Sequence, residues 1–90
     1  RQQLARSFTN DPQAYELFLI GRFQMTRRTP ADLRQAITTF GNAVKLDPNF
    51  APAYVGLADA YALLKLYDID APDDSYETAR SFAERAMAID

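Results

Sequence analysis

Acidic side chains are the residues of this chain best suited to chemistry, because histidine and cysteine are both absent. The stretch DIDAPDDSYE, which begins at Asp68, spaces its acids in a way that invites comparison with a calcium-binding loop. An EF-hand loop places an acid at its fifth position and glycine at its sixth. Counted from Asp68, those positions hold Pro72 and Asp73. We therefore interpret the stretch as a solvated loop that leads into a helix, and we expect no metal site.

Paired carboxylates are the second arrangement able to support catalysis, for example of hydrolysis. The candidates belong to separate predicted helices or loops: Glu16, Asp32, Asp59 and Glu77. A glycine-rich phosphate loop is also missing from the sequence, because its three glycines stand singly at Gly21, Gly41 and Gly56. Histidine, the commonest general base, is absent as well. We expect no enzymatic activity and no cofactor.

Basic side chains form the remaining charged group, which comprises Arg22, Arg27, Arg28 and Arg34. They could contact phosphate or an acidic partner. A simpler interpretation is that Arg27 and Arg28 lie near the C-terminus of a helix, where the helix dipole favours positive charge. The whole chain has a formal net charge of -2. We therefore expect no contact with nucleic acid and no attachment to a membrane.

Helices must position all of these residues, because apolar side chains recur at steps of three and four along the 90-residue chain. Asp11 and Pro12 predict the start of a first helix, as a capping residue followed by proline at the first helical position. Thr29 and Pro30 predict the start of a second helix in the same way. Asp32 stands three residues after Thr29, at the spacing of a capping box.

Proline and acidic residues also mark the later boundaries. Pro48 ends the second helix, and a third begins around Phe50 or Ala51. The stretch YDIDAPDD predicts a loop, after which Asp74 and Glu77 are spaced as a second capping box. The fourth helix is expected to face inward with Tyr76, Ala79, Phe82, Ala83 and Ala86. A short helical turn over residues 4–8 is a further expectation.

The chain contains an internal repeat. Ala14-Tyr15 recurs as Ala53-Tyr54, and two alanines seven residues apart recur later with the same interval, as Ala36 with Ala43 and Ala79 with Ala86. A repeat of this kind indicates two copies of one helix-turn-helix unit. We place the copies at about residues 12–48 and 50–90, within a single domain spanning residues 1–90.

These residues resemble the motif of the tetratricopeptide repeat (TPR). The family carries an aromatic residue, Leu-Gly and Tyr in the first helix of each repeat, and alanine, an aromatic residue, alanine and proline in and after the second helix. The residues that match, and that we expect to pack the repeats, are Tyr15, Ala36, Phe40, Ala43, Pro48, Tyr54, Leu57, Ala58, Tyr61, Ala79, Phe82 and Ala86. Both units are longer than the usual repeat of about 34 residues. The resemblance implies an all-α fold of about four main helices, a short right-handed superhelical solenoid.

A narrower likeness concerns the type of parent protein. The pair Gly21-Arg22, the turn from Arg28 to Pro30 and the stretch from Gly56 to Asp59 are similar to TPR regions of large bacterial regulators. Those regulators include cyclase-like proteins, protein kinases and winged-helix transcriptional activators. The resemblance implies that the chain is a fragment of a longer protein. It suggests, as an alternative function, the sensory or regulatory arm of such a regulator.

A concave groove is what the resemblance implies as the binding site, lined by the first helix of each repeat. The positions that fall there are Glu16, Ile20, Phe23, Val55, Asp59 and Ala62. A groove of this mixed apolar and acidic character would suit a helix or an apolar peptide bearing positive charge. The simpler alternative is that Ile20 and Phe23 pack against a neighbouring repeat or a flanking helix.

We therefore expect a protein-interaction or scaffolding module without catalytic activity, with a protein or peptide as its partner. Two repeats are fewer than the three or more that such arrays usually need for stability. For this reason the partner could also be a second copy of the chain, which makes self-association the other alternative. No apolar run approaches the roughly 20 residues of a membrane span, and we expect a cytoplasmic location.

Overall fold

Capping residues set the start of the first helix. Asp11 stands before Pro12, and its carboxylate accepts hydrogen bonds from the backbone N–H groups of Gln13 and Ala14, at 2.9 and 3.2 Å. The helix that follows, α2, spans Pro12–Met25 in the computed structural model, which describes residues 8–89. The predicted helix start is confirmed.

The second helix, α3, spans Pro30–Leu46 and begins with a similar cap. The Thr29 hydroxyl accepts a hydrogen bond from the backbone N–H of Asp32 at 3.1 Å. The same hydroxyl donates to the Asp32 carboxylate at 2.7 Å. In a standard capping box the acidic side chain accepts from the backbone N–H of the cap residue, so this cap is a variant in which the two side chains bind each other.

The joint between α3 and the third helix, α4 (Ala51–Tyr67), is tied by several hydrogen bonds. Asp47 ends α3, with its backbone N–H donating to the Ala43 carbonyl at 3.0 Å. Pro48 then prevents the helix from continuing. The Tyr54 hydroxyl donates to the Pro48 carbonyl at 2.9 Å, which fastens the first turn of α4 to the joint.

A loop of residues 68–74 connects α4 to the fourth helix, α5, which spans Ser75–Ile89. The Arg34 guanidinium of α3 pairs with the Asp68 carboxylate at 2.6 Å, which holds the start of the loop against α3. Further along the loop, Ala71 is buried in a small apolar cluster with Leu33 and Leu64. The predicted loop and fourth helix are therefore confirmed.

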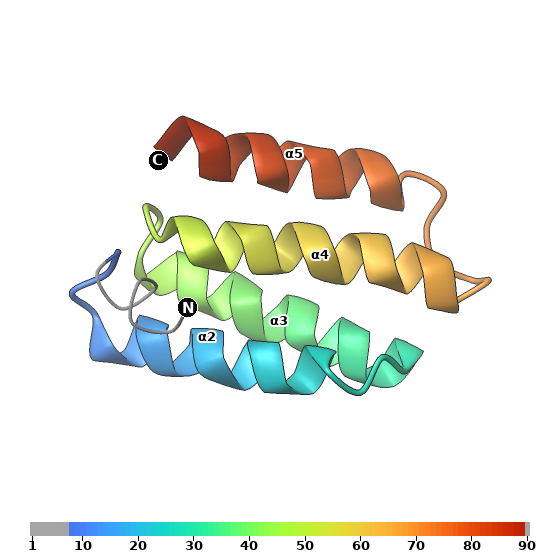
Figure 1. Ribbon diagram of the computed structural model, residues 1–90, viewed down its shortest axis with the longest axis horizontal. Helices are drawn as coiled ribbons and strands as arrows, with labels where there is room; N and C mark the ends of the chain where they lie inside the picture. Colours follow the sequence, from blue (N-terminus) through green and yellow to red (C-terminus); the bar gives the residue numbers. More distant parts are fainter. Residues whose placement is uncertain (1–7, 90) are drawn as a thin grey trace.

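Within residues 8–89 the four helices run antiparallel in sequence order, and each packs mainly on the next one (Figure 1). Helix α4 also touches α2, so it contacts all three of the others. The described part of the chain contains no β strand, which confirms the all-α expectation. None of its helices is both long and apolar enough to cross a membrane. The expected turn covers residues 4–8, of which only Phe8 belongs to the described residues. The rest of that expectation lies outside them.

Aromatic rings fill the core between α2, α3 and α4. The Phe18 ring packs against Phe40 and Phe50, with ring centroids 6.0 and 5.4 Å apart. Phe40 is fully buried, and its ring lies against two glycines. A Cβ atom on Gly21 or Gly56 would come within 2.7 or 2.6 Å of that ring, closer than non-bonded carbons approach. Both glycines are needed here because the ring occupies the space of a side chain.

A different arrangement joins α4 to α5. The Phe82 ring lies beside the rings of Tyr54 and Tyr61, with centroids 6.2 and 5.8 Å away. Phe82 and Tyr61 are only half-buried, whereas Ala79 and Ala86 are buried beneath them. Small residues thus bring the two helices together, and the aromatic rings cover the seam.

The residues expected to pack the repeats fall into three groups. Eight are buried: Ala36, Phe40, Ala43, Tyr54, Leu57, Ala58, Ala79 and Ala86. Tyr15, Tyr61 and Phe82 are half-buried, and Pro48 is exposed at the joint.

The expectation that Tyr76 faces inward is wrong, since 55% of this residue is exposed. Helix α5 turns the side of Ser75, Ala79 and Ala86 toward the core. The Ser75 hydroxyl donates to the Pro72 carbonyl at 2.6 Å and is buried. Successive helical positions differ by about 100°. Tyr76 therefore points to the side of that stripe.

Candidate functional site

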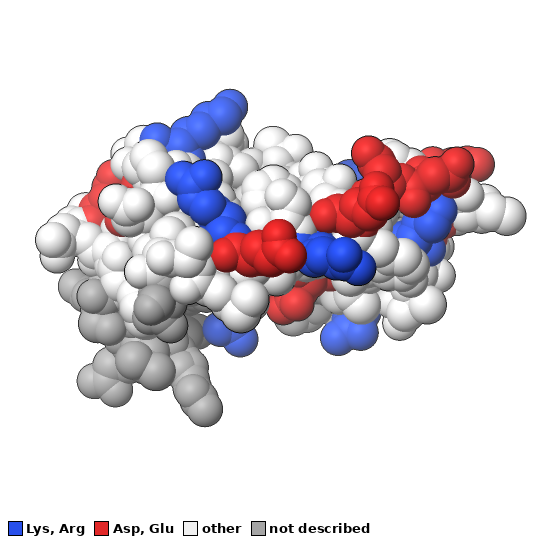
Figure 2. Space-filling model, turned by 90° about the horizontal axis from the view of Figure 1, so that it is seen from above, with Lys and Arg blue, Asp and Glu red and all other residues white. Residues whose placement is uncertain are grey.

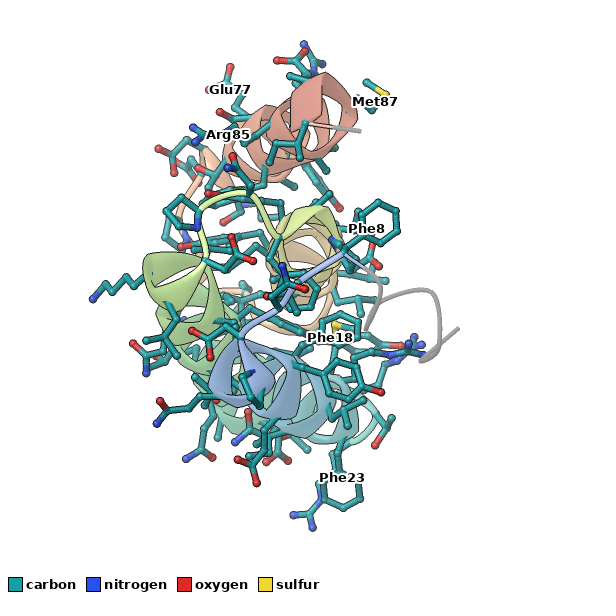
Figure 3. The ribbon with its side chains drawn as sticks, turned by 90° about the vertical axis from the view of Figure 1, so that its left-hand side faces the viewer. Phe8, Phe18, Phe23, Glu77, Arg85 and Met87 are labelled. Carbon is teal, nitrogen blue, oxygen red and sulfur yellow. The ribbon has the colours of Figure 1, made fainter. Side chains whose placement is uncertain are left out.

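A groove opens on the face where α2, α4 and α5 meet, and its cavity measures about 610 Å³. In Figure 3 the labelled side chains of Phe8, Phe18 and Met87 lie on this same side of the molecule. The floor comes from α4, through Ala51, Pro52, Val55, Gly56, Ala58 and Asp59. The walls come from Phe18, Arg22 and Met25 of α2, from Ala83, Ala86 and Met87 of α5, and from Phe8 before α2. Both helical hairpins therefore contribute to one site.

A second cavity of about 380 Å³ continues the groove along α2 and α4. It shares Arg22, Met25 and Asp59 with the first cavity and adds residues that follow them on the same two helices or in the turn after α2: Thr26, Arg28, Ala62 and Leu63. The first cavity is mainly apolar, and the second carries two arginines. Asp59 lies where the two cavities meet.

Among residues 8–89, the Asp59 carboxylate is the one acidic group that lines either cavity. It reaches solvent, but the surrounding helices remove part of its water, and this partial burial raises the pKa of Asp59 above its ordinary value. Within residues 8–89 it has no hydrogen bond or ion pair. Its neighbour Arg22 instead holds its guanidinium 5.6 Å from the centre of the Phe18 ring. Asp59 therefore makes no ion pair in the described structure, although Arg22 and Arg28 line the same cavities.

The positions expected to line the groove divide by helix. Val55, Asp59 and Ala62 of α4 do line the two cavities. Glu16, Ile20 and Phe23 of α2 do not, and all three are exposed. Their part in binding stays a prediction.

Helix α2 lines the groove with Phe18, Arg22 and Met25, which sequence reasoning did not single out for this purpose. This helix is apolar on several sides, so the spacing of its apolar residues does not reveal which side faces the groove. Met87 and Phe8 were missed for another reason. Each comes from an element outside the first helices of the two repeats, to which the family resemblance assigns the groove.

The four arginines do not form one anionic binding site. Arg34 pairs with Asp68, and Arg27 lies over the Phe23 ring with its guanidinium 5.5 Å from the ring centre. Arg28 has a backbone φ of 61° in the turn between α2 and α3. Positive φ at a residue other than glycine is uncommon and serves here to close that turn.

Acidic side chains gather at the end of the molecule where α4 and α5 are joined, as seen from above in Figure 2. Several already have partners in the described structure. Asp68 pairs with Arg34 and accepts a hydrogen bond from the backbone N–H of Asp70 at 2.9 Å, and Asp73 lies 3.5 Å from the Lys65 ammonium. Across residues 8–89, no three acidic side chains come together in a way that could hold a metal ion.

We compared the chain with protein-family models, with curated proteins and with solved structures, and none of them matched. The geometry of the groove and the sequence resemblance therefore carry the functional argument.

Proposed function

We propose that this chain is a protein-interaction or scaffolding module, built as two TPR-like repeats in a short solenoid, without catalytic activity of its own. The observation that carries the proposal is the groove shared by both hairpins, whose walls are mainly apolar and include Arg22, and whose floor carries Asp59 as its one acid among residues 8–89. A groove between packed helices is a common place for a partner's helix or extended peptide to bind. The proposal includes the cytoplasmic location expected from the sequence.

The chemistry of the lining indicates what such a partner must carry. Phe18, Val55 and Met87 offer apolar surface to an apolar or aromatic side chain. Asp59 offers a negative charge whose surroundings are already partly desolvated, so a lysine or arginine of the partner would find a stronger attraction there than on an open surface. The partner is therefore a helix or peptide with an apolar anchor and a nearby cation.

Fluorescence anisotropy with two labelled helical peptides tests this proposal. Both carry phenylalanine in an alanine and leucine background, and they differ in having lysine or glutamate one turn away. We expect the lysine peptide to bind more tightly, and we expect Val55→Gln to weaken its binding. Leu66→Gln is the matched control, because Leu66 is an exposed apolar residue of α4 outside the groove. Equal binding of both peptides, or binding that survives Val55→Gln unchanged, would overturn the proposal.

A further inference from the structure

An aromatic residue with a cation on top of it projects from the outer side of α2. Phe23 is 62% exposed, and the Arg27 guanidinium lies 5.5 Å from the centre of its ring. In Figure 3, Phe23 points away from the rest of the molecule. We call this pair, Phe23 and Arg27, the α2 knob. Burial of a ring this exposed would release water from apolar surface.

The groove offers the complementary chemistry. Val55 and Met87 are 47% and 72% exposed on its floor and wall, although both are large apolar residues. Asp59 lies on the same floor and makes no ion pair among residues 8–89, although Arg22 lines the same cavity. The α2 knob carries an aromatic ring and a guanidinium, which match the exposed apolar side chains and the unpaired carboxylate of the groove.

The two surfaces cannot meet within one molecule. The groove residues Phe8, Phe18 and Met87 lie above α2 in Figure 3, while Phe23 points down and away from α4 and α5. A contact between knob and groove therefore requires two copies. It joins different surfaces of the two copies, which makes it heterologous and allows further copies to add at either end.

We propose that the groove binds the α2 knob of a second copy of this chain, with Phe23 against Val55 and Met87 and with Arg27 paired to Asp59. This inference rests on the proposed function, because it names the partner of the same groove. It also gives Asp59 a role, since a carboxylate held in an apolar groove is tolerated at lower cost when a cation pairs with it.

Sedimentation velocity over a concentration series tests the proposal on the full chain. The wild-type chain is expected to show species heavier than the 10.2 kDa monomer, in proportions that grow with concentration. Phe23→Glu removes the knob and Asp59→Lys inverts the charge of the groove, so each variant alone should remain a monomer. Leu66→Glu places a charge on an exposed apolar position outside both surfaces and should associate as the wild type does. Circular dichroism confirms that each variant is folded.

Mixing the Phe23→Glu and Asp59→Lys variants gives a sharper test. The Asp59→Lys chain keeps an intact knob and the Phe23→Glu chain keeps an intact groove, so an equimolar mixture should form a dimer of one chain of each kind. A chain that carries both Arg27→Asp and Asp59→Lys should regain association, because the charges are exchanged in both surfaces. A wild type that stays monomeric at its highest soluble concentration, or a mixture that stays monomeric, would overturn the proposal.

The peptide experiment described for the proposed function separates the two failures. If the wild-type chain is a monomer but the lysine peptide still binds in a Val55-dependent way, the groove serves another partner and only the self-association is wrong. If neither the second copy nor the lysine peptide binds, the groove is not a binding site and both proposals fall.

Discussion

The two sides of α4 differ in how completely they are filled. On the side of α3, the Phe40 ring occupies the whole space between Gly21 and Gly56 and is fully buried. On the side of α5, Phe82 is only half-buried, and the groove that α4 and α5 share with α2 measures about 610 Å³. The alanine interval that repeats from α3 to α5 puts Ala83 of α5 at the place of Phe40, and Ala83 lines this groove. The small side chain of Ala83 therefore leaves a groove open at the repeated position that the Phe40 ring fills on the other side of α4.

This difference predicts unequal costs for removing the two rings. Phe40→Ala should lower the free energy of unfolding by about 3–5 kcal/mol, because it leaves a cavity in a fully packed site. Phe82→Ala should cost about 1–2 kcal/mol, since its ring already meets solvent and less apolar area is lost. Urea unfolding followed by circular dichroism measures both. Equal losses would show that the two sides of α4 are packed to the same degree.

Substitution of the glycines tests the filled side directly. Gly56→Ala should destabilise the fold by up to about 2 kcal/mol, because the new methyl group overlaps the Phe40 ring by more than the gain in helix propensity offsets. Gly41→Ala is the matched control in a neighbouring helix, where no side-chain or tertiary atom lies within 4 Å of the new Cβ. That variant should gain about 0.5–1 kcal/mol. Changes of the same sign in the two variants, measured by urea unfolding, would contradict the tight packing of Phe40.

The open side carries a charge, and its effect on stability should depend on pH. Because partial burial raises the pKa of Asp59, the folded chain holds this proton more tightly than the unfolded chain does. At neutral pH the ionised carboxylate therefore destabilises the fold, and Asp59→Asn should increase stability slightly. The gain should shrink as the pH falls through the folded and then the unfolded pKa, and it should disappear below about pH 3, where the wild-type carboxyl is protonated in both states. Urea unfolding at the two pH values checks the sign, and a gain that persists in acid would contradict it.

Helix boundaries were predictable because they depend on local chemistry. Asp11 and Thr29 cap helices through hydrogen bonds to residues two or three positions away, and Pro48 stops a helix by its own geometry. The start of α5 is partly different. There the Ser75 hydroxyl donates to the Pro72 carbonyl at 2.6 Å, and the backbone N–H of Thr78 donates to the Asp74 carbonyl at 2.9 Å. The capping box expected from Asp74 and Glu77 stays a prediction, although the boundary itself agrees with the sequence.

The rotation of α2 was not predictable in the same way. The sequence favours Phe18 for the interior, and Phe18 is buried, but apolar residues surround this helix and its spacing does not show which side lines the groove. Phe23, which the family resemblance assigns to the groove, is 62% exposed and does not line it. The choice depends on Gly21, which lets the Phe40 ring approach one side of the helix. A contact between residues 19 positions apart leaves no trace in local spacing. The orientation of the groove wall on α2 follows from that contact, and for this reason the sequence alone assigned other residues to it.

Gly21, Phe40 and Gly56 come from three different helices and share one volume. Their identities are consequently not independent: in a related chain, a larger residue at position 21 or 56 would be compatible with the same helix spacing only if position 40 became smaller. A larger residue introduced first at position 21 or 56 would overfill the site, and a smaller residue introduced first at position 40 would leave a cavity. Neither change would therefore be neutral on its own. The three positions are therefore expected to be retained together or replaced together, and a helix pair taken from another repeat could be joined to this one only if it brought a matching glycine.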